Sequence, residues 1–201
     1  MSRLGPALAL ALAGSLTLGA CTTPAGPVEV TRFVAEDRQD MLGSGTIFVT
    51  AAESEGSDMQ PLLPYQAAVA RELTSLGYRE TGQADARQVA KVRITQSVVG
   101  ADRSPVSVGG GGSVGSYGSG AGVGIGINLG GGRKQQLSTR LEVRIVDKAS
   151  DKTLWEGRAI FDAPAGSNMS DSAQNASVMA DALFRSFPGS NGETFEVRIN
   201  E

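Results

Sequence analysis

Few residues in this sequence are of the types that carry out enzyme chemistry. Histidine is absent, and Cys21 is the only cysteine among 201 residues, so no disulfide can form within the chain. Gly111, Ser113 and Gly115 match the G-x-S-x-G pattern of a serine nucleophile, but that serine needs a histidine base. Zinc and related metals are usually held by histidine and cysteine. We therefore expect no serine hydrolase, no metal site and no cofactor.

Carboxylates are the remaining candidates for catalysis. Asp147, Asp151, Glu156 and Asp162 form the nearest cluster in the sequence. Catalysis by carboxylates alone, as in glycosidases, needs two acids that face one cleft, and turn or surface positions explain these four more simply. The sequence therefore predicts a protein that is not an enzyme, with a carboxylate-based hydrolase as the least favoured alternative.

The N-terminal residues predict export. Arg3 supplies a positive charge, an apolar stretch covers residues 7–18, and small residues follow. This is the three-part layout of a secretory signal peptide. A membrane-spanning helix needs about 20 apolar residues, so this stretch is too short to remain as a span. We expect residues 1–20 to be removed.

Cys21 is expected to carry the membrane anchor. The run Leu18-Gly19-Ala20-Cys21 resembles the bacterial lipobox, which implies cleavage between Ala20 and Cys21 and a diacylglycerol on the cysteine sulfur. Two or three acyl chains together hold a protein on a bilayer essentially permanently. Thr22, rather than aspartate, follows the cysteine, and by analogy with known lipoprotein sorting this favours the outer membrane, with the protein facing the periplasm. Residues 21–27 then form a lipidated tether.

The rest of the chain has the composition of one folded domain, residues 28–201. Apolar residues make up 40% of the sequence, which is enough for a core. Without Arg3 the mature chain carries 17 basic and 21 acidic residues. Because no long basic run is present, the electrostatic signature of a nucleic-acid-binding protein is missing.

Apolar periodicity predicts both strands and helices. The first helix begins near Pro64 and ends before Gly77, and the second runs from about Ser170 to Phe187. The apolar stripe of the first helix is expected to contain Ala67, Val69, Ala70, Leu73 and Leu76, and that of the second Ala176, Met179, Leu183 and Phe187. Strands are expected over residues 28–33, 46–50, 90–99, 137–146, 153–161 and 194–199.

These elements predict an α+β fold, with a mainly antiparallel sheet, two helices packed on one face and a glycine-rich hairpin insertion. Trp155 and Phe161 are expected in the core rather than on a ligand platform. Within strand 137–146, one face is expected to hold Leu137, Thr139, Leu141, Val143 and Ile145, and the other Arg140, Glu142 and Arg144.

The insertion, residues 109–132, is unusually rich in glycine. Glycines alternate with branched residues over 122–127, which predicts a β-ribbon with an apolar face, whereas a helix is disfavoured because each interior glycine costs about 1 kcal/mol relative to alanine. Two interpretations remain open: a flexible hairpin extension, or a ribbon that contacts membrane or a partner. The residues expected to make such contacts are Tyr117, Val123, Ile125, Ile127 and Leu129.

The tether, the LPYQAAVARELTSLGY helix, the LSTRLEVRIVDKASDKTLWEGRAIF hairpin and the final helix ending in Phe187-Pro188 resemble DUF4136 lipoproteins. The resemblance covers most of residues 28–201, and Trp155-Glu156-Gly157 is its most recognisable piece. It implies a small bacterial lipoprotein with an uncharacterised domain. It brings no established catalytic residues to this chain.

The sequence favours a non-catalytic cell-envelope lipoprotein whose periplasm-side domain binds or stabilises an envelope partner. An alternative is a carrier or sensor of a small apolar ligand such as lipid. That alternative requires a cavity between helices and sheet lined by residues such as Leu73, Leu183 and Phe187.

Overall fold

The protein folds into an α+β structure with one large sheet and two helices. The computed structural model describes residues 25–52, 62–100, 106–115, 118–127 and 135–199. The strands of the large sheet are β1 Val28–Val34, β2 Gly45–Ala51, β3 Tyr78–Glu80, β4 Gln88–Val99, β7 Gln136–Asp147, β8 Lys152–Pro164 and β9 Thr194–Val197, and the helices are α1 Leu62–Ser75 and α2 Ser172–Phe184. Short 3-10 helices occupy Glu36–Met41 and Asn168–Ser170.

The large sheet is mixed, in contrast to the mainly antiparallel sheet expected from the sequence. Its strand order is β3-β2-β4-β7-β8-β1-β9, and β2 runs parallel to both of its neighbours, β3 and β4. The cause is α1, which follows β2 and returns the chain to the same end of the sheet, as a helical crossover does between parallel strands. The pairs that join β4, β7, β8, β1 and β9 are antiparallel.

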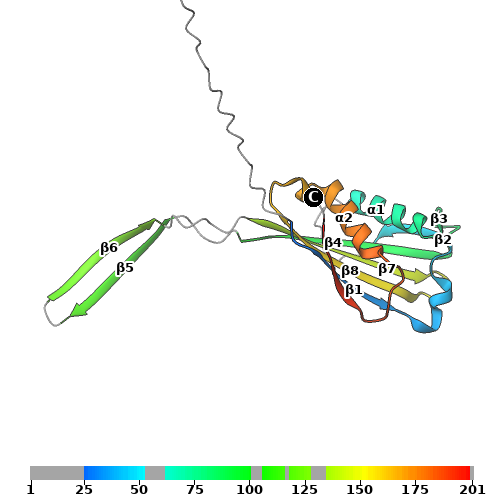
Figure 1. Cartoon of the computed structure of the whole chain (residues 1–201), viewed down its shortest axis with the longest axis horizontal. Helices are drawn as coiled ribbons and strands as arrows, with labels where there is room; N and C mark the ends of the chain where they lie inside the picture. The colour runs from blue at the N-terminus through cyan, green and yellow to red at the C-terminus, as the bar shows by residue number, and fades with distance from the viewer. Residues whose placement is uncertain (1–24, 53–61, 101–105, 116–117, 128–134, 200–201) are drawn as a thin grey trace, which may run out of the picture.

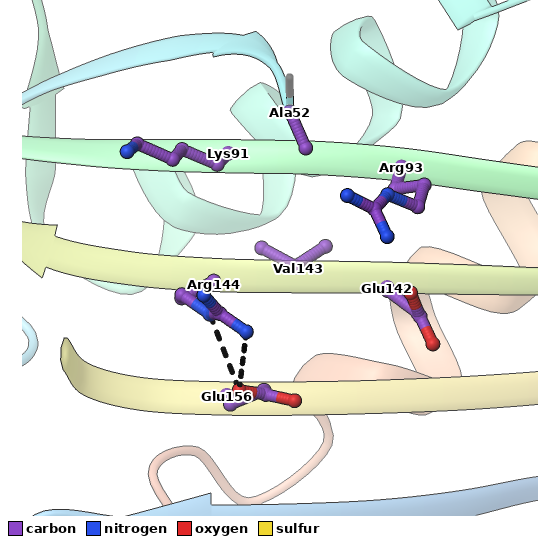
Figure 2. A pocket seen from close by; sticks show the side chains of 7 residues that line it. All are labelled: Ala52, Lys91, Arg93, Glu142, Val143, Arg144 and Glu156. Carbon is purple, nitrogen blue, oxygen red and sulfur yellow. Dashed lines mark hydrogen bonds and ion pairs between the residues drawn. The ribbon is translucent and has the colours of Figure 1, made fainter. Parts of the chain in front are cut away.

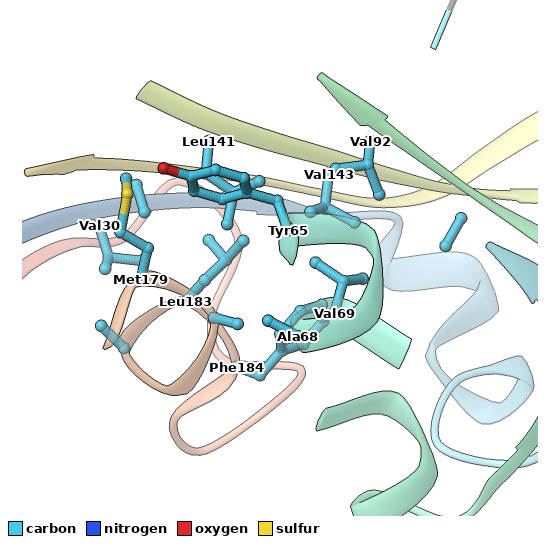
Figure 3. Close-up of a cluster of buried hydrophobic side chains, with 14 of the residues drawn as sticks. Val30, Tyr65, Ala68, Val69, Val92, Leu141, Val143, Met179, Leu183 and Phe184 are labelled. Atoms are coloured by element: carbon cyan, nitrogen blue, oxygen red, sulfur yellow. The ribbon is translucent and has the colours of Figure 1, made fainter. Parts of the chain in front are cut away.

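Both helices pack on the same face of this sheet (Figure 1). Figure 3 shows Tyr65 and Val69 of α1 and Leu183 of α2 directed toward Leu141 and Val143 of the sheet. Helix α1 follows most of the expected stripe, because Val69 and Leu73 are buried and Ala70 and Leu76 are half-buried. It buries Tyr65, Ala68, Val69 and Leu73, and Ala67 is exposed. The reason is that Tyr65, a large apolar ring one turn before Ala68 and Val69, sets the buried side of the helix.

The C-terminal helix is shorter than the sequence predicts. Asp171 caps its first turn, because its Oδ1 accepts hydrogen bonds from the backbone N–H groups of Ala173 and Gln174 at 2.9 and 3.4 Å. The helix ends at Phe184, and Ser186 adopts a left-handed conformation with φ 55°. Phe187 therefore lies beyond the helix, where it still packs against the core.

Strands β5 Val106–Gly115 and β6 Gly118–Ile127 pair antiparallel in a separate two-stranded sheet, from Val106 opposite Ile127 to Gly115 opposite Gly118. They fall within and beside the glycine-rich insertion. Among the described residues, no helix is both long and apolar enough to cross a bilayer.

Candidate functional site

The face of the large sheet opposite the helices carries rows of charged side chains. Alternation along β7 sends Leu141, Val143 and Ile145 into the core, where each is fully buried. The same alternation sends Arg140, Glu142 and Arg144 to the other side of the sheet, as predicted. The helices do not cover that side (Figure 1), so we refer to it as the open face.

Charged side chains on the open face form two cross-strand rows. In the first row Lys91 of β4 lies opposite Arg144 of β7, which lies opposite Glu156 of β8. Arg144 Nη2 and Glu156 Oε2 are 3.2 Å apart, and Figure 2 shows this ion pair. Adjacent strands place opposed side chains about 4.5–5.5 Å apart, so such rows interact directly.

The second row lies two residues along the strands and has a different order of charges. Arg93 lies opposite Glu142, which lies opposite Arg158. One ion pair in this row joins Arg158 Nε to Glu142 Oε1 at 3.0 Å. These pairs are partly exposed, so solvent screens them and each contributes little to stability. Their effect is to fix where charge is presented.

Charge is unevenly distributed over the open face. On β4 and β7 it is basic, because Lys91, Arg93, Arg140 and Arg144 outnumber the single acid Glu142. We call these four the basic stripe. Lys91 and Arg140 make no ion pair with any residue that the structure describes. On the adjoining strands β8, β1 and β9 the acids are more numerous; they are Glu156, Asp162, Glu29 and Glu196.

A shallow hollow of about 230 Å³ lies on the open face where the two rows meet. Small-molecule sites commonly have volumes of about 300–1,000 Å³, so this hollow suits a single charged side chain or headgroup rather than a whole cofactor. Its lining residues are Ala52, Lys91, Arg93, Glu142, Val143, Arg144 and Glu156 (Figure 2).

The four carboxylates considered from the sequence are not brought together. Asp147 and Asp162 lie at opposite ends of the β7–β8 hairpin, since Asp147 pairs with Lys152 and Asp162 pairs with Ser138. Asp151 stands in the turn, with φ 53°. Among the described residues no group of three or more acids or cysteines is placed to hold a metal.

Asp147 has a local structural role. Its Oδ2 accepts hydrogen bonds from the hydroxyl and the backbone N–H of Ser150. These bonds, first that of the hydroxyl and then that of the N–H, lower the pKa of Asp147. A carboxylate held ionised in this way stabilises the turn between β7 and β8.

The aromatic residues of the hairpin belong to the core, as predicted. Trp155 and Phe161 are both fully buried, and Trp155 stacks on Phe184 at 5.3 Å between ring centroids. Leu73 and Leu183 are fully buried and Phe187 contacts Trp155. The three side chains proposed for a ligand cavity are therefore packed against protein.

A buried polar network lies between the helices and the sheet, and no pattern in the sequence indicated it. The Tyr65 hydroxyl donates a 2.9 Å hydrogen bond to Asn175 Oδ1. Gln96 Nε2 donates to both Tyr65 and Thr139 at 3.3 Å, and Asn175 Nδ2 donates to the Met169 carbonyl at 2.9 Å. These groups come from α1, α2, β4 and β7, so only the assembled fold brings them together.

The remaining predicted site residues fall on the insertion and the N-terminus. Ala20, Cys21, Tyr117 and Leu129 lie outside the described residues. Val123, Ile125 and Ile127 lie in β6, paired with Gly110, Val108 and Val106.

Comparison with known proteins identifies a family and a fold. The family described as "Domain of unknown function (DUF4136)" matches residues 52–189. No curated protein matches the chain. A PDZ domain protein from Parabacteroides distasonis has 13% identity and a TM-score of 0.50; the alignment covers 85% of this chain and 39% of that chain. This likeness concerns the fold, and the chain spans well under half of that protein.

Two structures of a PelC dodecamer from Paraburkholderia phytofirmans are also similar. The first has 9% identity and a TM-score of 0.43, covering 78% of this chain and 94% of that one. The second, of a variant with one substitution, has 12% identity and a TM-score of 0.38, covering 79% of this chain and 98% of that one.

Proposed function

The chain belongs to the DUF4136 family, and from that premise we propose that it is a non-catalytic cell-envelope lipoprotein. In this proposal Cys21 anchors the protein to the membrane, and the domain binds an envelope protein through the open face of the sheet. The location proposed is the outer membrane, facing the periplasm.

The observation that carries the proposal is the basic stripe on an otherwise acidic protein. The mature chain has more acidic than basic residues, yet Lys91, Arg93, Arg140 and Arg144 gather on two adjacent strands. Such segregation favours a partner with acidic groups, because complementary charge fixes register and speeds encounter. Lys91 and Arg140 have no acidic partner in the described chain, so they are free to pair with one across an interface.

Photo-crosslinking in cells tests this surface. A photoreactive amino acid replaces Thr95, which is exposed on the open face opposite Arg140. We expect a crosslinked product of defined mass that is lost in the Lys91→Glu, Arg140→Glu variant. The matched control is Arg71→Glu, Arg79→Glu, which makes the same charge change on α1 and β3 and should leave the product intact.

Three results would overturn the surface assignment: no product from position 95, equal loss in both double variants, or a product containing only two copies of this chain. The anchor has its own test. Mass spectrometry of the mature N-terminal peptide should show an acylated Cys21, and Cys21→Ser should release the protein from the membrane fraction. An unmodified peptide would refute the anchor while leaving the crosslinking result standing.

A further inference from the structure

The pairing of β5 with β6 divides the glycine-rich ribbon into two faces of different chemistry. Successive residues of a strand belong to opposite faces, and directly paired residues share a face. Val106 pairs with Ile127, Val108 with Ile125, and Gly110 with Val123. These branched residues therefore belong to one face.

The other face of the ribbon has no large residue at all. Ser107 pairs with Gly126, Gly111 with Gly122, and Ser113 with Gly120. Every position on that face, along both strands, is glycine or serine. The sequence of β6 alone indicated an apolar face, but only the register shows that β5 adds its valines to the same side.

A ribbon of this kind needs an apolar cover on one side only. A two-stranded hairpin is marginally stable in water on its own and requires packing of its hydrophobic face. The sequence has no charged residue from Ser104 to Gly132, whereas Asp102 and Arg103 precede this stretch and Arg133 and Lys134 follow it. Uncharged apolar residues whose flanks carry three basic residues and one acid match the chemistry of a bilayer and its anionic headgroups.

The chain leaves the large sheet toward the ribbon at the same end where β1 begins. Gly26, which precedes β1, donates its N–H to the Asp162 carbonyl at 3.4 Å, near the end of β8. The last residue of β4, Val99, pairs with Gln136, which pairs with Pro164. The start of β1, the end of β4 and the start of β7 thus lie at one end of the sheet (Figure 1).

Two exposed apolar residues mark this end of the sheet. Val98 and Val99 are the last two residues of β4, where the chain leaves toward the ribbon, and they are 58% and 53% exposed. A tether over residues 21–27 spans at most about 25 Å when fully extended, while strands as long as β5 and β6 extend about 34 Å. A bilayer that holds Cys21 is therefore within the ribbon's reach.

We propose that the ribbon is a second membrane contact, with Val106, Val108, Val123, Ile125 and Ile127 against the acyl chains and the glycine-serine face away from them. The proposal rests on the membrane anchoring proposed above, because the anchor is what brings lipid to this end of the sheet. In this arrangement the lipid at Cys21 and the ribbon hold the domain at two points.

The test uses full-length mature protein carrying Cys21→Ser, which has no acyl chain and no remaining cysteine. Vesicles of phosphatidylethanolamine and phosphatidylglycerol are the probe, and binding is measured by flotation. Replacing Val123, Ile125 and Ile127 by serine should weaken binding more than about 10-fold, because three branched side chains lose their apolar contact. The matched control, Ser107→Asn with Ser113→Asn, alters the opposite face and should retain binding.

A second measurement keeps the proposal falsifiable if the serine variant misfolds. Single cysteines at Gly124, Ile125, Gly126 and Ile127 are labelled with a polarity-sensitive fluorophore. On vesicle addition we expect a blue shift at positions 125 and 127 and little change at 124 and 126.

The proposal would be overturned by similar fluorescence shifts at all four labelled positions. It would also be overturned by absence of vesicle binding, or by equal binding of the two ribbon variants. Self-association without vesicles that the serine variant abolishes would also overturn it, in favour of a second copy as the cover. Because the protein tested lacks the anchor, these results are independent of whether Cys21 is acylated.

Discussion

The indole of Trp155 occupies the space that a side chain at Gly157 would need. A Cβ atom built at Gly157 would lie 2.8 Å from Leu183 Cδ1 and closer still to the Trp155 ring. Trp155 is fully buried, and its Nε1 donates a 2.9 Å hydrogen bond to the Pro188 carbonyl. The two residues are neighbours on one face of β8, so the glycine lets the tryptophan lie flat along the strand and beneath α2.

Gly157→Ala should therefore destabilise the protein by about 1–3 kcal/mol, the usual cost of overpacking a core. The measurement is the free energy of unfolding from urea denaturation. Gly82→Ala is the matched control, because nothing lies within 4 Å of its Cβ position, and it should be neutral or slightly stabilising. Equal stability of the two variants would contradict the packing account.

Arg32 is a buried charge that depends on Glu193. Its side chain is 1% exposed, its Nη1 lies 3.4 Å from Glu193 Oε1, and its guanidinium lies 4.5 Å from the centroid of the Phe195 ring. Burial lowers the pKa of Arg32, although Glu193 acts in the opposite direction. The charge therefore needs its acidic neighbour.

Glu193→Gln should cost about 1–2 kcal/mol of unfolding free energy, because it leaves the buried guanidinium without its counter-charge. Adding Arg32→Met should recover part of that loss, since an apolar side chain of similar length suits the site. A double-mutant cycle measures the coupling. Glu196→Gln, on the exposed open face, should change stability by less than about 0.5 kcal/mol. If the changes in unfolding free energy caused by Arg32→Met and Glu193→Gln simply add in the double variant, the pairing is refuted.

Two buried tyrosines should make the protein sensitive to alkali. Burial raises the pKa of Tyr65 and of Tyr78 from 10.0 to about 12. Above pH 10 the unfolded chain loses these protons while the folded protein retains them, so stability falls as pH rises from about 10 to about 12. Tyrosinate absorbance and circular dichroism followed together should show their ionisation coinciding with unfolding. Tyr65→Phe, Tyr78→Phe should flatten the pH dependence, and an unchanged slope would contradict it.

The Asp171 cap of α2 makes a local contribution to stability that can be tested by itself. Asp171→Ala removes the acceptor for two backbone N–H groups and should cost about 1 kcal/mol. Asp171→Asn keeps an acceptor oxygen at the same position and should retain most of the stability. Thermal unfolding of the two variants side by side is the measurement, and an equal loss in both would show that the charge rather than the cap is responsible.

The sequence by itself determined the strands with one apolar face, the two helices and which residues of β7 face the core. It did so because side-chain alternation is a local property of an extended chain. Lys91, Arg93, Arg140 and Arg144 could therefore be assigned to a polar face from the sequence. That their strands are neighbours, and that the face has a basic stripe, depends on the order β4-β7-β8 in the sheet.

Only the tertiary structure decided the direction of β2, the fit of Gly157 under Trp155 and the two-faced register of the ribbon. Each of these depends on contacts between separate segments, and periodicity within one segment carries no information about its neighbours. The hydrogen bond between Tyr65 and Asn175, which lie 110 residues apart, has the same origin. Local pattern set what each element is, and the packing of the sheet against its helices set which side chains meet.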